Sequence, residues 1–171
     1  MPISQIENNA LASTGLSATK LTTGTLPKSQ LPTGSVLQVV QAKFDTFAYT
    51  SSATLSSTGY NVQITPQSAS SKILVMFNAP AYMGGSSRHM YSTIYRNSTN
   101  LAPTSGGELS LTSSGTTAGS GWQQCSMHIL DSPNTTSQLT YTVYFRSIDT
   151  NQVYFGEGAS WQVITAMEIA G

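Results

Sequence analysis

The segment QLTYTVYFRS, residues 138–147, decides the fold class because its apolar and polar side chains alternate strictly. The apolar set consists of Leu139, Tyr141, Val143 and Phe145. Threonines, Tyr144 and Arg146 occupy the positions between them. A period of two places the apolar set on one face of a half-buried strand. The segment therefore predicts a β-strand with one face in a core and the other toward solvent.

Six other segments have strand-like patterns, and turn clusters rich in Gly, Ser and Thr separate them. They are YNVQI (60–64), KILVMFN (72–78), RHMYSTIYR (88–96), WQQCSMHIL (122–130), VYF (153–155) and SWQVITAMEI (160–169). The segment 72–78 is apolar on both faces, which is typical of a central strand that is covered on each side. No ten-residue stretch has a convincing helical period. The pattern predicts an all-β fold, an antiparallel jelly-roll-like sandwich over residues 44–171.

Residues 1–43 differ in composition, because Phe44 is the first aromatic side chain and Ser, Thr, Gly, Ala, Leu and Pro dominate before it. The aliphatic residues of this segment that we single out are Ile3, Ile6, Leu11, Leu16, Leu21, Leu26 and Leu31. Their near five-residue spacing from Leu11 fits neither a helix nor a strand. A segment without its own fold needs outside partners for its backbone groups. We expect an extended arm that attaches or oligomerises the protein, a flexible linker being the alternative.

The chain carries few charges, and they cancel. Seven Lys and Arg oppose seven Asp and Glu, so that 8% of the residues are charged, against about 25% in an average soluble protein. A neutral chain has no basic field for a phosphate backbone, so we expect no nucleic-acid partner. One cysteine excludes an intrachain disulfide framework. The absence of a long apolar run argues against membrane insertion by a helix.

Catalytic chemistry has few candidate residues. No G-x-S-x-G motif is present, and His89 and His128 are the only histidines that could act as a base. Asp149 and Glu157 flank a short segment and could form a glycosidase pair, although carboxylates at strand ends are usually solvated turn residues. Cys125 alternates with apolar residues, which predicts a buried, inert thiol. We expect no catalytic residue, no metal site and no cofactor.

Binding is better supported than catalysis. β-Sandwiches hold recognition loops on rigid strands, and the longest candidate loops are 80–87 and 103–122. Tyr82 and Trp122 are the aromatic residues there that we expect to reach solvent, where a sugar ring could stack on them. The alternative is that both rings pack beneath their own loops.

Several segments of the sequence resemble a known class of protein. LTTGTLPKSQLPTGSVLQVV (21–40) is similar to the segment that leads into the distal domain of bacteriophage tail-fibre and related virion-fibre proteins. ITPQSASSKILVMFNAP, IYRNSTNLA, HILDSPNTTSQLTYTVYFRS and the ending WQVITAMEIAG resemble the sandwich domains of such chains. The resemblance implies a homotrimer whose arm attaches to tail, baseplate or major capsid proteins. It also implies a sandwich displayed on the virion toward a host-surface glycan, after synthesis in the host cytoplasm.

The resulting expectation is a non-enzymatic virion structural protein, a trimeric fibre-like appendage. The main alternative is a capsid decoration protein, a cement or head fibre that stabilises or ornaments the phage head. Both stay open because the chain lacks the shaft of longer fibres. A phage polysaccharide depolymerase is the third hypothesis, and it requires a cleft with carboxylates roughly 5–10 Å apart.

Overall fold

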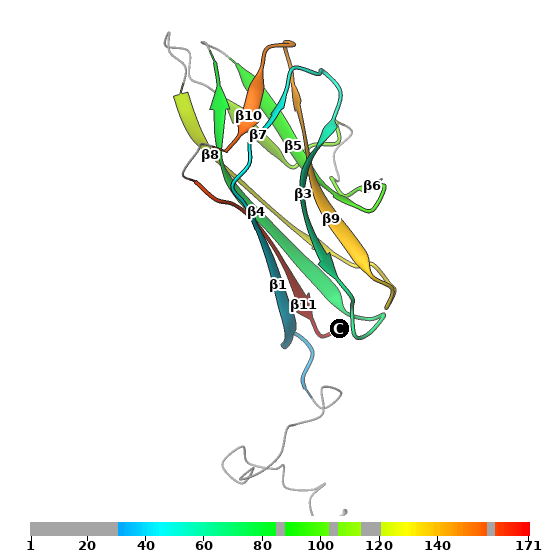
Figure 1. The fold of residues 1–171 in the computed structure, drawn as a ribbon. Helices are drawn as coiled ribbons and strands as arrows, with labels where there is room; N and C mark the ends of the chain where they lie inside the picture. Colours follow the sequence, from blue (N-terminus) through cyan, green and yellow to red (C-terminus); the bar gives the residue numbers. More distant parts are fainter. Residues whose placement is uncertain (1–30, 85–87, 103–105, 114–120, 157–159) are drawn as a thin grey trace, which may run out of the picture. The chain divides into compact units, whose positions relative to one another are not determined.

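The computed structural model describes residues 31–84, 88–102, 106–113, 121–156 and 160–171 (Figure 1). Every regular element in these ranges is a β-strand, so the predicted all-β class is confirmed. The strands are β1 (Val36–Phe44), β2 (Ala48–Thr50), β3 (Ser56–Ile64), β4 (Lys72–Met83), β5 (His89–Arg96), β6 (Thr99–Asn100), β7 (Ser110–Ser113), β8 (Gly121–Asp131), β9 (Leu139–Ser147), β10 (Val153–Phe155) and β11 (Gln162–Ile169). Of the predicted arm residues, only Leu31 is described; Ile3 to Leu26 lie outside these ranges.

The strands form two antiparallel sheets, which we term sheet A and sheet B. In sheet A, one side of β4 pairs with β8. On the other side, the first half of β4 pairs with β11 and the end of β4 pairs with β10. β1 continues the sheet beyond β11, and β2 continues it beyond β10. Sheet B has the order β3-β9-β5, with β6 and β7 both paired to β5. The orders β1-β11-β4-β8 in sheet A and β3-β9-β5-β7 in sheet B are the arrangement of a jelly roll.

The core lies between the two sheets and follows the predicted alternation. Sheet B contributes the inward-facing set Leu139, Tyr141, Val143 and Phe145, all of which are buried. Sheet A contributes Ile73, Val75 and Phe77 from β4, which are fully buried. Phe145 of sheet B stacks on Phe155 of sheet A at 5.4 Å between ring centroids. Each large side chain buried in this way contributes about 1.5–3 kcal/mol to stability.

The sandwich begins earlier in the chain than residue 44. β1 pairs with β11 from Val36↔Ile169 to Phe44↔Gln162, and Figure 1 shows the two strands side by side. The alternation in β1 is interrupted by a register shift between Val36 and Gln38. Because β1 is also a sheet edge with partly exposed side chains, its sequence lacks the pattern by which the other long strands are recognised. Residues 36–43 thus belong to sheet A.

Candidate functional site

An aromatic row crosses four strands at one end of the outer face of sheet A. It consists of Trp122 in β8, Tyr82 in β4, Tyr154 in β10 and Tyr49 in β2. Each residue is the register partner of the next across the sheet. The sequence neighbours of the three tyrosines are buried in the core, so the tyrosines lie on the opposite face. Strand pairing thus gathers four rings that are far apart in sequence.

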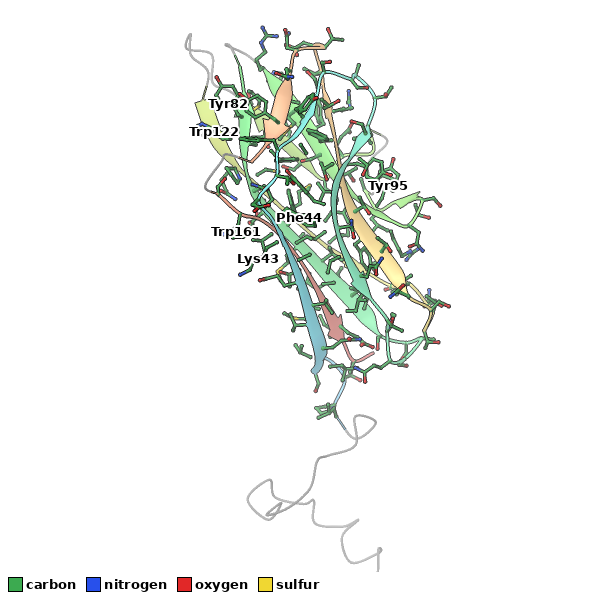
Figure 2. The ribbon with its side chains drawn as sticks, viewed as in Figure 1. Lys43, Phe44, Tyr82, Tyr95, Trp122 and Trp161 are labelled. Atoms are coloured by element: carbon green, nitrogen blue, oxygen red, sulfur yellow. The ribbon has the colours of Figure 1, made fainter. Side chains whose placement is uncertain are left out.

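Three rings of the aromatic row, those of Tyr82, Tyr154 and Trp122, contact one another directly. Tyr82 stacks on Tyr154 with centroids 4.7 Å apart and an angle of 19° between the ring planes. Trp122 lies 5.1 Å from Tyr82, beside which it appears in Figure 2, and meets Tyr154 edge-on at 5.9 Å. Phe47, which precedes β2, meets Tyr154 edge-on at 6.5 Å. Pairs of this kind contribute about 0.5–1.5 kcal/mol each beyond their buried area, so the rings hold one another in place.

A shallow pocket of about 400 Å³, largely open to solvent, lies at the β2 end of the row and is lined by Phe47, Tyr49, Gln152 and Tyr154. Phe47 is 57% exposed and Tyr49 is 69% exposed, so both rings are open to solvent. None of the four lining side chains is charged. The volume falls within the range of about 300–1,000 Å³ that is usual for ligand pockets. The pocket therefore offers aromatic faces and one amide group to a ligand.

Tyr82, which the sequence predicts in the loop 80–87, lies within β4 instead. Trp122, predicted where the loop 103–122 meets the strand 122–130, lies within β8. The pairing of β4 with β8 extends to Met83↔Gly121, beyond both aromatic residues. Tyr82 is half-buried by its ring contacts, whereas Trp122 is 37% exposed. The structure brings the two predicted residues together as neighbours, which their separation in the sequence could not reveal.

Sequence reasoning missed Tyr49, Tyr154 and Phe47. The alternation in VYF (153–155) was a usable signal for Tyr154, because Val153 and Phe155 are both buried. No such signal marked Tyr49, since β2 is only three residues long and a period of two cannot be recognised in it.

A second apolar surface lies at the opposite end of the same face, and we term it the aliphatic patch. Its members are Val36 and Val39 in β1, Met167 and Ile169 in β11, Leu74 in β4 and Leu130 in β8. The register rows Val36↔Ile169 and Val39↔Met167↔Leu74↔Leu130 place them beside one another. Val39 is 54% exposed and Leu130 is 51% exposed. The patch therefore presents a continuous aliphatic surface to solvent.

A more polar band separates the aliphatic patch from the aromatic row. Three register rows lie between them, and their polar residues include Gln41, His128, Asn78, Ser126 and Gln124. The only Lys, Arg, Asp or Glu side chains that the described strands place on this face are Lys43 and Lys72. The outer face of sheet B is mixed. It carries polar side chains such as Gln63, Thr140 and Arg146, and also the pair Tyr95 and Tyr144, which stack with ring centroids 4.0 Å apart.

The histidines and the cysteine do not form a site. His89 lies in sheet B and His128 in sheet A. The prediction of a buried thiol is confirmed, because Cys125 is 1% exposed and its Sγ lies 3.4 Å from Ser92 Oγ. Among the described residues, no cluster of three or more His, Cys, Asp or Glu side chains could hold a metal ion. No helix in the described ranges has the length and apolar character needed to cross a membrane.

Asp149 is poorly suited to the acid role in a glycosidase pair. Burial alone would raise its pKa, but hydrogen bonds from Ser147 Oγ, from the Asn151 N–H and from Arg88 outweigh burial and lower it. A glycosidase acid needs the opposite, a raised pKa that keeps it protonated at neutral pH. The other predicted member, Glu157, lies outside the described residues.

The fold and two surfaces of sheet A, the aromatic row with its pocket and the aliphatic patch, are therefore the basis for a functional assignment. No protein-family model matches the chain, and no curated protein matches it.

Proposed function

We propose that the protein is a non-enzymatic bacteriophage virion component, a fibre-like appendage whose copies associate through the aliphatic patch. The resemblance to virion fibres supports the virion assignment and a trimeric state. The segment that precedes β1, residues 1–35, would attach the assembly to other virion proteins, and the sandwich would be displayed toward the host surface. The observation that carries the proposal is the exposed aliphatic patch on the outer face of sheet A, a face on which the described strands place no acidic side chain.

The strand β4 gives the clearest argument for a covering partner. Its segment 72–78 is apolar on both faces, a pattern typical of strands buried on both sides. Sheet B covers Ile73, Val75 and Phe77, whereas Leu74 points outward into the aliphatic patch. Exposed contiguous apolar surface of this kind marks sites of protein association. A partner that covers the aliphatic patch would bury Leu74, so that β4 would be covered on both faces, as its sequence pattern predicts.

A second copy of the chain is the occupant that fits this surface. The two lysines are the only full charges that the described strands place on this face. Lys43 lies outside the aliphatic patch, and Lys72 borders it as the register partner of Ile169. Identical copies can therefore meet through the patch with one lysine per chain at its margin. The first residue of β1, Val36, is itself a member of the aliphatic patch. Association through the patch would therefore gather the beginnings of the sandwiches from all copies, which suits attachment through their N-terminal arms.

Charge placed in the aliphatic patch tests the proposal. Leu74→Asp and Val39→Asp should convert the full-length protein from oligomer to monomer in size-exclusion chromatography with light scattering, because each buries a charge in the contact. The circular dichroism spectrum should be retained, since both side chains point away from the core. Gln63→Asp, on the exposed outer face of sheet B, is the matched control and should leave the oligomer intact. An oligomer that survives both patch substitutions would contradict the proposal.

The position on the virion requires a separate experiment. Chemical cross-linking in purified virions should join the segment before β1, residues 1–35, to tail or baseplate proteins. Cross-links to the major capsid protein would make the protein a capsid decoration protein instead of a fibre.

A further inference from the structure

The pocket beside β2 has a wall that is rigid before any ligand arrives. Tyr154 lies on β10, which is paired on one side with β4 and on the other with β2. Its ring is stacked on Tyr82 and is met edge-on by Phe47. A ligand that contacts this wall loses little free energy to the ordering of side chains, because the strands and ring contacts have already ordered it.

The chemistry of the pocket selects for an uncharged, hydroxylated ligand. The C–H groups on one face of a pyranose ring carry partial positive charge, and the faces of aromatic rings carry partial negative charge, so the two attract. Gln152 is exposed and adds one acceptor and two donors, the set that neighbouring sugar hydroxyls can match. Acidic sugars are instead recognised by Arg or Lys, and neither residue type lines this pocket.

We propose that Phe47, Tyr49, Gln152 and Tyr154 form a binding site for a pyranose ring of a neutral glycan. The inference deepens the host-binding part of the proposed function and rests on it only for the biological source of the glycan. The sugar contact expected at Tyr82 and Trp122 is thereby assigned to the four pocket residues instead. Tyr82 supports the site because its ring stacks on that of Tyr154. The polar band separates this site from the aliphatic patch, so sugar binding and self-association are distinct properties.

Saturation-transfer NMR on the full-length protein tests the site with the methyl glycosides of glucose, mannose and galactose and with N-acetylglucosamine. At least one of these sugars should bind at millimolar concentration. Tyr49→Ala should weaken its binding about tenfold, a loss typical of removing one aromatic contact. Gln152→Ala should weaken binding several-fold through the lost hydrogen bonds. Trp161→Ala removes an aromatic side chain that is 58% exposed and outside the pocket, so it should bind sugar normally.

Three results would overturn the site. The first is that none of the neutral sugars binds, and the second is that Tyr49→Ala binds the sugar as well as the wild type does. The third is that choline or sialic acid binds while no neutral sugar does. Choline is included because aromatic pockets also bind quaternary ammonium groups.

Failure of the site and failure of self-association are distinguishable. Tyr49→Ala should keep the oligomeric state of the wild type. Leu74→Asp should keep the affinity of each chain for a soluble sugar. It should nonetheless lose about 10²- to 10⁴-fold in apparent affinity for a glycan-coated surface, since simultaneous binding by several chains is abolished.

Discussion

Two buried carboxylates fix parts of the sandwich through different sets of partners. Glu168 is fully buried in β11 and accepts hydrogen bonds from Gln38 Nε2 at 2.5 Å and from the Gln67 N–H at 2.7 Å. Asp131 accepts two bonds from Arg96 Nη1, at 2.8 and 2.9 Å, and a third from Tyr141 Oη at 2.7 Å. A buried carboxylate destabilises a fold unless its oxygens are paired in this way. Glu168 thus ties β1 and the segment after β3 to β11, and Asp131 joins sheet A to sheet B.

Glu168 makes stability depend on pH. Burial alone would raise its pKa, but its hydrogen bonds, including those from Gln38 and Gln67, outweigh burial and lower it. The resulting stabilisation is complete above the unfolded-state pKa of about 4.3 and is lost as the pH falls through the lower folded-state pKa. Glu168→Gln should lower the free energy of unfolding at neutral pH by about 1–3 kcal/mol. It should also reduce the amount by which that free energy falls as the pH is lowered. Urea unfolding at several pH values measures both effects. A variant whose free energy of unfolding falls at low pH as steeply as that of the wild type would contradict this role.

The two arginine–aspartate pairs at Asp131 and Asp149 should differ in their contribution to stability. Arg96→Met leaves the buried Asp131 without its cation, which should cost about 3–5 kcal/mol. Arg88→Met breaks the more exposed pair with Asp149, which should cost less than about 1 kcal/mol. Chemical denaturation of both variants gives the comparison, and a larger loss for Arg88→Met would be inconsistent with the structure.

At the scale of elements, β1 marks where the sandwich begins. The second compact unit of the chain starts at Pro32. Within it, β1 pairs with β11 along nearly its whole length, and the ring centroids of Phe44 and Tyr60 lie 4.9 Å apart. Removal of residues 1–31 should leave a sandwich that melts within a few degrees of the full chain. Removal of residues 1–44 also deletes β1 and should abolish cooperative unfolding. Thermal circular dichroism distinguishes the two, and equal behaviour of both truncations would refute this boundary.

The strands that the sequence predicts best are those with many alternating residues. The buried faces of β9 and of the second half of β3 were predicted correctly, because a period of two is a local property of the chain. β2, β6 and β7 contain two to four residues, too few to establish a period. The aromatic row was half predicted, through Tyr82 and Trp122. Its completion by Tyr49 and Tyr154 depends on pairing between distant segments, which local patterns do not encode.

At the scale of the whole molecule, the outer face of sheet A has two surfaces at its opposite ends. The aliphatic patch lies where β1 begins, and the aromatic row lies at the far end of β4. Under the proposed function, the first holds copies together and the second presents sugar-binding pockets. Several weak pockets on one assembly would bind a polymeric glycan far more tightly than one pocket alone.

Sedimentation equilibrium of the full chain and of residues Pro32–Gly171 tests the central claim, self-association through the sandwich. We predict that both sediment as trimers at micromolar concentration, since the aliphatic patch lies wholly within Pro32–Gly171. A monomeric full chain, or a monomeric sandwich beside a trimeric full chain, would contradict the account.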